Sequence, residues 1–161
     1  MDPAAEHDLI REISRHVLTQ IAPQELPLFT AASAAWFADP AAAMKASKNR
    51  DAALGFGADA FSILFTPLVL QVVSEIMPML GGIALKATET AVGEEVSALV
   101  RKMFRRGESE TRPDAAPALN TEQLGEVHRH VIAAGKRLRL DHAQTQRLAD
   151  AVVAQFVLPK K

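Results

Sequence analysis

The apolar residues of this chain recur at helical spacing, and no stretch alternates apolar and polar residues over the length of a strand. The first apolar series begins after Asp2-Pro3, which has the pattern of a helix N-cap followed by proline at the first helical position. Pro23 ends this series. Its members are Leu9, Ile13, Val17 and Ile21. The pattern predicts an all-α protein that begins with an amphipathic helix.

Prolines mark the start of two further segments. Pro27 opens a short helix that places four apolar residues on one side, namely Leu28, Phe29, Ala32 and Trp36. Asp39-Pro40 repeats the cap-and-proline signal and predicts a short alanine-rich turn through Met44. Residues 47–51 are polar and predict a loop, whose last residue, Asp51, caps the following helix.

The composition changes sharply over residues 52–85, where Asp59 and Glu75 are the only charged residues. Thr66-Pro67 predicts either a kink in one long helix or a new helix that begins with a threonine cap. Pro78 and Gly81-Gly82 predict a further break. A helix that is apolar on every face is typical of the centre of a bundle, so residues 52–82 are predicted to form the core.

The next predicted helix runs from Ile83 to Phe104. Its apolar stripe consists of Val92, Val96, Leu99, Val100 and Met103. A basic patch at its end suits the negative end of the helix dipole and consists of Arg101, Lys102, Arg105 and Arg106. Residues 107–119 lack periodicity and contain two prolines, which predicts a flexible linker.

Two capping boxes lie beyond the linker, at Asn120-x-x-Gln123 and Asp141-x-x-Gln144. They predict two helices that form an antiparallel hairpin. The first helix directs Leu124, Val127, Val131 and Leu138 inward. The buried edge of the second consists of Leu148, Ala151, Val152, Gln155 and Phe156.

The predicted architecture is a helical bundle of about five to seven helices around an apolar central helix or kinked helix pair, with a C-terminal hairpin. We divide the chain into a bundle over residues 1–106, the linker 107–119 and a hairpin over 120–161. Two short helices alone bury too little surface to be stable. The hairpin is therefore expected to dock on its own bundle or on a partner.

Composition narrows the location of the protein. The 161 residues include 18 Lys and Arg, 19 Asp and Glu and no Cys, so the formal net charge is -1. Disulfides and thiolate chemistry are thereby excluded. The acidic, polar N-terminus does not have the pattern of a secretory signal, which predicts a cytoplasmic protein, with peripheral membrane association as the alternative. The Ala- and Arg-rich composition is typical of a GC-rich bacterium.

Catalytic, cofactor and metal motifs are not evident in the sequence. Gly55-x-Gly57 lacks the third glycine of a dinucleotide-binding loop and the Lys-Ser/Thr of a phosphate-binding loop. His128 and His130 point about 200° apart on a helix and therefore do not chelate one ion. We predict a non-enzymatic protein without cofactor, metal or small-molecule substrate.

The leading functional hypothesis is a protein–protein interaction or self-assembly module, such as an adaptor or oligomer, whose partner is another protein or a second copy. Helix-on-helix contacts through Ala, Val and Leu suit its apolar, aromatic-poor composition. The candidate contact residues lie in the central segment and the hairpin. They are Phe61, Leu64, Leu68, Val72, Leu148, Val152 and Phe156.

A second hypothesis is conditional membrane insertion of residues 60–85 as a hairpin that turns near Pro78–Gly82. Asp59 and Glu75 would act as gates, because protonation lowers the cost of carrying a carboxyl group into the bilayer. The basic patch at Arg101–Arg106 would contact lipid headgroups. The uncharged runs are too short for constitutive spanning.

A third hypothesis is weak DNA binding through the hairpin corner, from Lys136 to Arg147. Lys136, Arg137 and Arg139 cluster ahead of a polar helix and loosely resemble a helix-turn-helix. Two helices are fewer than such a unit needs, and the net charge attracts phosphate poorly, so nucleic acid is an unfavoured partner.

Overall fold

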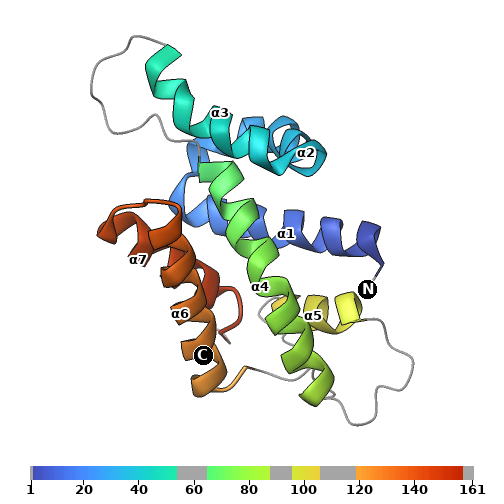
Figure 1. The fold of residues 1–161 in the computed structure, drawn as a ribbon. Helices are drawn as coiled ribbons and strands as arrows, with labels where there is room; N and C mark the ends of the chain where they lie inside the picture. The colour runs from blue at the N-terminus through green and yellow to red at the C-terminus, as the bar shows by residue number, and fades with distance from the viewer. Residues whose placement is uncertain (1, 54–64, 88–95, 106–118, 158–161) are drawn as a thin grey trace.

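The structure is a computed structural model that describes residues 2–53, 65–87, 96–105 and 119–157; for residues 48–53, 87, 102 and 105 only the backbone is described. In these ranges the protein is all-α, with seven α-helices, one 3-10 helix and no strand (Figure 1). This confirms the predicted helical bundle. The elements are α1 (Pro3–Ile21), η1 (Pro23–Leu28), α2 (Phe29–Ala38), α3 (Pro40–Ala53), α4 (Phe65–Ala87), α5 (Val96–Arg105), α6 (Thr121–Arg137) and α7 (His142–Ala154).

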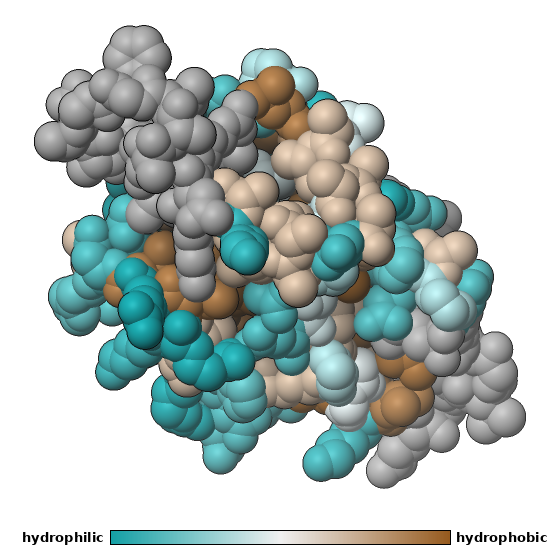
Figure 2. Space-filling view, turned by 45° about the horizontal axis from the view of Figure 1, so that its top comes forward, coloured by the Kyte–Doolittle hydropathy of each residue, from teal (hydrophilic) through white to brown (hydrophobic). Residues whose placement is uncertain are grey.

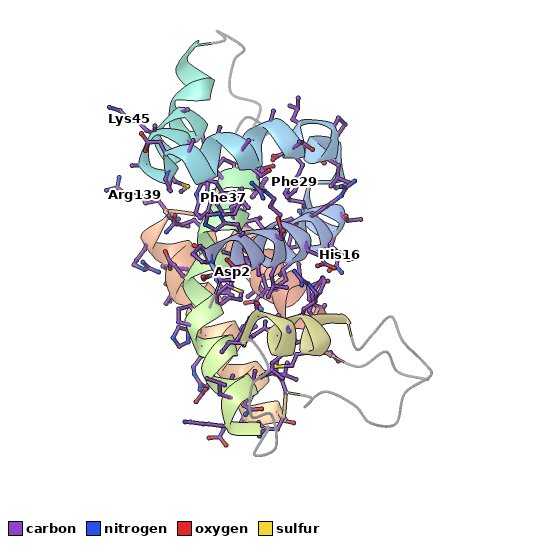
Figure 3. All side chains as sticks on the ribbon, turned by 90° about the vertical axis from the view of Figure 1, so that its right-hand side faces the viewer. Asp2, His16, Phe29, Phe37, Lys45 and Arg139 are labelled. Atoms are coloured by element: carbon purple, nitrogen blue, oxygen red, sulfur yellow. The ribbon has the colours of Figure 1, made fainter. Side chains whose placement is uncertain are left out.

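The helix α1 starts and ends as predicted. The side chain of Asp2 accepts a hydrogen bond from the backbone N–H of Ala4 at 3.2 Å, and Pro3 is the first helical residue. After η1 the chain reverses, and α2 lies along α1 in the antiparallel sense (Figure 3). Trp36 is buried as expected, but Leu28 is 51% exposed, because the 3-10 turn that contains Pro27 directs it outward.

The prediction of a short turn and a polar loop after Asp39-Pro40 is wrong. Asp39 caps as expected, since its side chain accepts a hydrogen bond from the N–H of Ala42 at 3.0 Å. However, α3 continues to Ala53, so residues 47–51 are helical and Asp51 lies within a helix instead of before one. Alanine, lysine and arginine are strong helix formers, and they outweigh the weaker propensity of Ser47 and Asn49.

The central helix α4 begins at Phe65, so Pro67 lies in its first turn, where a missing N–H costs no intrahelical bond. The predicted break at Pro78 and Gly81-Gly82 is wrong, because α4 continues to Ala87. Burial of its side chains against neighbouring helices outweighs the poor propensity of these residues. The fully buried members are Val69, Leu70, Val72, Val73, Met77, Leu80 and Ala84.

The core is built around α4, which contacts α1, α2, α3, α5 and α6. Figure 1 shows α4 running through the molecule, with α2 and α3 at one end and the α6–α7 hairpin beside its other half. The prediction of an apolar central helix is therefore confirmed for residues 65–82. The rest of the predicted core segment, residues 54–64, lies outside the described residues.

The helix predicted from Ile83 to Phe104 is divided differently in the structure. Ile83 belongs to α4, Val92 lies outside the described residues, and α5 begins at Val96. Within α5, Leu99, Val100 and Met103 are buried as the stripe predicted. Most of the predicted linker, residues 107–118, also lies outside the described residues.

The C-terminal hairpin forms as its two capping boxes predicted. Asn120 and Gln123 bond reciprocally at the start of α6, and Asp141 and Gln144 do so at the start of α7. The α6 helix ends in a Schellman motif, in which the Leu140 N–H donates to the Gly135 C=O at 3.0 Å. Arg139, the residue before Leu140, has the positive φ of 61° that this motif requires. The hairpin packs on its own chain, since α7 contacts α1 and α6 contacts α4.

Candidate interaction surfaces

The residues predicted to contact a partner lie in the core. Leu68 and Val72 on α4, and Leu148, Val152 and Phe156 at α7, are all buried within the single chain. Phe61 and Leu64 lie outside the described residues. The helical spacing of apolar residues identified the helix faces that pack inside the chain. These five residues are therefore not available to a partner in this conformation.

A different face of α4 remains uncovered. Its exposed residues are Pro78, Leu85 and Lys86, and Leu85 is 52% exposed. Half-buried residues on the same side are Gln71, Ser74, Glu75, Met79 and Gly82. At about 100° per residue, Gly82 lies near the middle of this arc, between Met79 on one flank and Leu85 on the other. We call this set, from Gln71 to Lys86, the open face of α4.

A groove runs along one flank of this face, between α4 and α6. It has a volume of about 450 Å³ and is lined by Met79, Glu126, Arg129, His130 and Ala133. Its floor is apolar and its walls carry both signs of charge. Such a groove suits an apolar side chain with a charged neighbour. The sequence held no signal for it, because its two walls are far apart in the chain.

Glu75, one of the two proposed membrane gates, lies in the N-terminal part of the open face, one helical turn after Gln71. Its carboxylate accepts a hydrogen bond from Gln71 Nε2 at 2.9 Å and is ion-paired with Arg137 of α6. Burial raises the pKa of Glu75, but the hydrogen bonds from Gln71 and Arg137 and the Arg137 charge together lower it below its ordinary value. The other gate, Asp59, lies outside the described residues.

The basic patch is only partly described. Arg101 lies 3.4 Å from the carboxylate of Glu12 on α1 and is half-buried, so its charge ties α5 to α1. Only the backbone is described for Lys102 and Arg105, and Arg106 lies outside the described residues. Contact with lipid headgroups stays a prediction for this patch.

The hairpin corner proposed for DNA binding carries exposed cations at Lys136, Arg139 and Arg147. Arg137 also lies there, but it is ion-paired with Glu75. Because the Glu75 carboxylate offsets the charge of Arg137, only three of the four cations are left to attract phosphate. The helices α1 and α4, not a dedicated third helix of the unit, pack behind the hairpin.

A second hollow lies where α1, α2 and α4 meet, with a volume of about 250 Å³. Its aromatic lining includes Phe37 of α2 (Figure 3). The Phe37 ring contacts the ring of His7 at 4.3 Å between centroids and the guanidinium of Arg11 at 4.5 Å from its centroid. Ser74 also lines the hollow, but its hydroxyl donates to the backbone C=O of Gln71 at 2.7 Å. The serine proton is therefore engaged by the helix instead of by the imidazole.

Three other histidines, namely His16, His128 and His130, make contacts within the chain. Gln146 Nε2 lies 3.1 Å from both His128 Nε2 and the carboxylate of Asp150, which links α6 to α7. His130 Nδ1 lies 3.0 Å from the C=O of Glu126, and His16 packs edge-on against Phe104. Among the residues that the structure describes, no group of three His, Asp or Glu side chains is placed to hold a metal ion.

The outer side of α2 and α3 is rich in alanine. From Leu26 to Met44, Asp39 is the only charged residue. The exposed alanines are Ala31, Ala34, Ala35, Ala38, Ala41, Ala42 and Ala46. Figure 2 shows the resulting pale brown area in the upper half of the molecule, beside more polar regions. Together with Leu28, it is a second weakly polar surface, at the opposite end of the molecule from Leu85.

The carboxylate of Glu25 is the main polar site that sequence reasoning missed. It is buried and accepts hydrogen bonds from the backbone N–H groups of Phe65 and Thr66 at 2.7 and 2.8 Å and from the Thr66 hydroxyl at 2.7 Å. Glu25 thus caps α4 from forty residues away, and Thr66, the predicted cap, is a donor instead.

Comparisons with known proteins add no further candidate for the site. No protein-family model, no curated protein and no solved structure matches the chain. Function is therefore inferred from the exposed faces, the charges and the packing of the chain itself.

Proposed function

We propose that this protein is a non-enzymatic helical interaction module that assembles with further copies of itself. The observation that carries the proposal is the open face of α4. The helix supplies more buried apolar side chains than any other described element, yet it leaves Pro78 and the large apolar side chain of Leu85 exposed and Gly82 half-buried. Half-buried Met79 and Gly82 extend the apolar surface of Leu85 along the same face, and contiguous exposed apolar surface is typical of contact sites.

Two further features support this proposal. The alanine-rich side of α2 and α3 is weakly polar and smooth, which suits close contact with another helix. Both the Ser74 hydroxyl and the Phe37 ring in the hollow between α1 and α2 are engaged in contacts within the chain. Binding through exposed faces therefore has more structural support than chemistry in that hollow.

Self-assembly is tested by the concentration dependence of the mass. Sedimentation equilibrium or light scattering of the full chain is measured from about 10 µM to 1 mM, the range in which small helical interfaces associate. We expect the mass to rise from the 17.4 kDa of one chain towards a multiple of it. A mass of one chain at every concentration would contradict self-assembly.

A second candidate function is conditional membrane association through α4. Residues Phe65–Lys86 are long and apolar enough to cross a membrane, and their most apolar window of 18 residues has a mean hydropathy of 1.8 and is 56% buried. The form proposed from the sequence is corrected, since residues 65–87 are one helix with no turn at Pro78–Gly82. Glu75 and its partner Arg137 would oppose insertion at neutral pH.

Liposome flotation separates the two functions. If α4 inserts, the protein co-floats with vesicles that contain anionic lipid at pH 4.5 more than at pH 7, and Glu75→Gln increases binding at pH 7. Vesicles of neutral lipid alone are the control for electrostatic attraction. Absence of flotation at both pH values would eliminate this candidate and leave self-assembly unaffected.

A further inference from the structure

Three polar side chains at the junction of α6 and α7 form a compact triangle. His128 belongs to α6, while Gln146 and Asp150 lie one helical turn apart on α7. The His128 Nε2 atom lies 3.1 Å from Gln146 Nε2 and 3.4 Å from Asp150 Oδ1. The third side of the triangle joins Gln146 Nε2 to Asp150 Oδ1 and is 3.1 Å long. Side chains from two helices therefore converge on one point.

The amide of Gln146 orders the other two groups. Its nitrogen carries two hydrogens, and the acceptors within reach are the imidazole nitrogen of His128 and the carboxylate of Asp150. The contact with His128 is a hydrogen bond only when Nε2 carries no proton, so the ring proton then lies on Nδ1. In this arrangement the Nε2 lone pair and the carboxylate charge are directed to the same place.

The triangle has the dimensions of a metal-binding site. Zinc binds imidazole nitrogen and carboxylate oxygen at about 2.0–2.2 Å. The circle through the three atoms has a radius of about 1.9 Å, so an ion roughly 1 Å from their plane lies about 2.1 Å from each of them. Two ligands of a zinc tetrahedron are about 3.4 Å apart, as are His128 Nε2 and Asp150 Oδ1.

We propose that His128, Gln146 and Asp150 bind a divalent transition-metal ion, for which Zn²⁺ is best suited. The Gln146 amide rotates by half a turn about its terminal bond, so that its oxygen takes the place of its nitrogen and coordinates the ion. Coordination then replaces the two hydrogen bonds of the amide. The imidazole ligand favours zinc over magnesium and calcium, which prefer oxygen ligands.

The proposed site is open to solvent. The side chain of His128 is 35% exposed and that of Asp150 is 65% exposed, so water can complete the coordination shell. Three protein ligands and a water are a common arrangement for zinc. Because one ligand is a neutral amide and solvent competes, we expect a dissociation constant on the order of 100 µM, far weaker than that of a structural zinc site.

The ion would join α6 to α7 within one chain, so this inference is independent of the proposed self-assembly. The neighbouring His130 provides a matched comparison. It lies on the same helix and is exposed, but its Nδ1 atom lies 3.0 Å from the backbone C=O of Glu126 in the same helix. Only His128 combines an imidazole with a carboxylate of the other helix.

Zinc chloride alone is the probe. The full chain is first dialysed against EDTA and then into a buffer without chelator at pH 7. Isothermal titration calorimetry measures the dissociation constant. The melting temperature is recorded with and without about 1 mM zinc, and we expect it to rise by about 3–6 °C and to return when EDTA is added.

Four variants locate the bound ion. His128→Ala and Asp150→Asn should each raise the dissociation constant at least tenfold, because each removes a first ligand. Gln146→Glu should lower it about fivefold or more, because an anionic oxygen replaces a neutral one. A gain of affinity does not result from a damaged fold. His130→Ala is the control and should change the constant less than twofold.

The opposite outcomes would overturn the site. Zinc that binds His128→Ala as tightly as the wild type is held elsewhere on the chain. Equal losses in His128→Ala and His130→Ala would show dispersed binding to surface histidines. A Gln146→Glu variant without a gain, or a wild-type chain that takes up no zinc at about 1 mM, also contradicts the proposal. Self-assembly is measured with no metal present and is unaffected by any of these results.

Discussion

At the scale of single residues, Glu25 joins two distant parts of the chain. Its buried carboxylate accepts two backbone N–H bonds and one hydroxyl bond at the first turn of α4. Negative charge at this end of a helix is stabilising, and donors left without an acceptor in a buried site are costly. The orientation of α4 relative to η1 therefore depends on one side chain.

Replacement of Glu25 measures this cap. We expect Glu25→Ala to lower the free energy of unfolding by about 2–4 kcal/mol, because three donors lose their acceptor. Glu25→Gln should cost less, since one oxygen remains. Urea denaturation provides the measurement, and Gln24→Ala, at an exposed neighbouring residue, is the control. Equal stabilities of Glu25→Ala and Gln24→Ala would show that the cap contributes little.

Glu75 gives a prediction about pH. Its folded-state pKa lies below the ordinary value of 4.5, so folding favours the ionised carboxylate. Its contribution to stability is therefore complete above the unfolded-state pKa and is lost as pH falls through the folded-state pKa. We expect Glu75→Gln to be less stable than the wild type by up to about 1 kcal/mol at pH 7, because the ion pair is partly exposed.

The measurement is a urea titration at pH 7, 5 and 3. The difference between the wild type and Glu75→Gln should shrink below pH 4.5. A difference that grows in acid would have the opposite sign from the one that the Arg137 and Gln71 contacts require.

At the scale of elements, the α6–α7 crossing depends on a glycine. A Cβ atom at Gly135 would lie 2.6 Å from Cγ2 and 2.9 Å from Oγ1 of Thr145, so the two helices approach more closely than any larger residue permits. Gly125, in the same helix, has only an ordinary 3.7 Å contact with a flexible side chain. These two glycines form a natural pair for comparison.

We expect Gly135→Ala to destabilise the protein by about 1–3 kcal/mol through overpacking, despite the better helix propensity of alanine. Gly125→Ala should stabilise it by about 0.5–1 kcal/mol, because propensity acts there without a clash. In a Thr145→Ala background the cost of Gly135→Ala should fall, and a double-mutant cycle measures the coupling. Additive effects at these two positions would contradict the close contact.

At the scale of the whole molecule, the hairpin and the N-terminal helices share one core. Phe156 packs edge-on against Phe104 of α5, with ring centroids 6.4 Å apart, and α7 contacts α1. Two short helices bury too little apolar surface to be stable alone. The hairpin is therefore expected to unfold together with the bundle.

Two probes test this expectation. Trp36, the single tryptophan, reports on α2 by fluorescence, and hydrogen exchange of the α6 and α7 amides reports on the hairpin. Their urea transitions should coincide, as expected for one cooperative unit. If the hairpin amides lose protection at a lower urea concentration than Trp36 responds, the hairpin is a separate unit.

The accuracy of sequence-based prediction differs between residues for a physical reason. The caps at Asp2, Asn120 and Asp141 were predicted because each joins groups within four residues of one another. The break expected at Pro78 was wrong because local propensity was weighed without the burial that opposes it. Candidate contact residues were likewise taken from apolar faces that the fold uses internally.

The sequence alone determined the helical class, the starts of α1, α6 and α7 and the apolar character of the central helix, since propensity, capping and periodicity are properties of neighbouring residues. Only the tertiary structure decided that α4 is unbroken, that Glu25 caps it, and that Leu85 remains exposed. These features depend on which distant elements pack together. Patterns among neighbouring residues do not specify which distant elements lie close together in space.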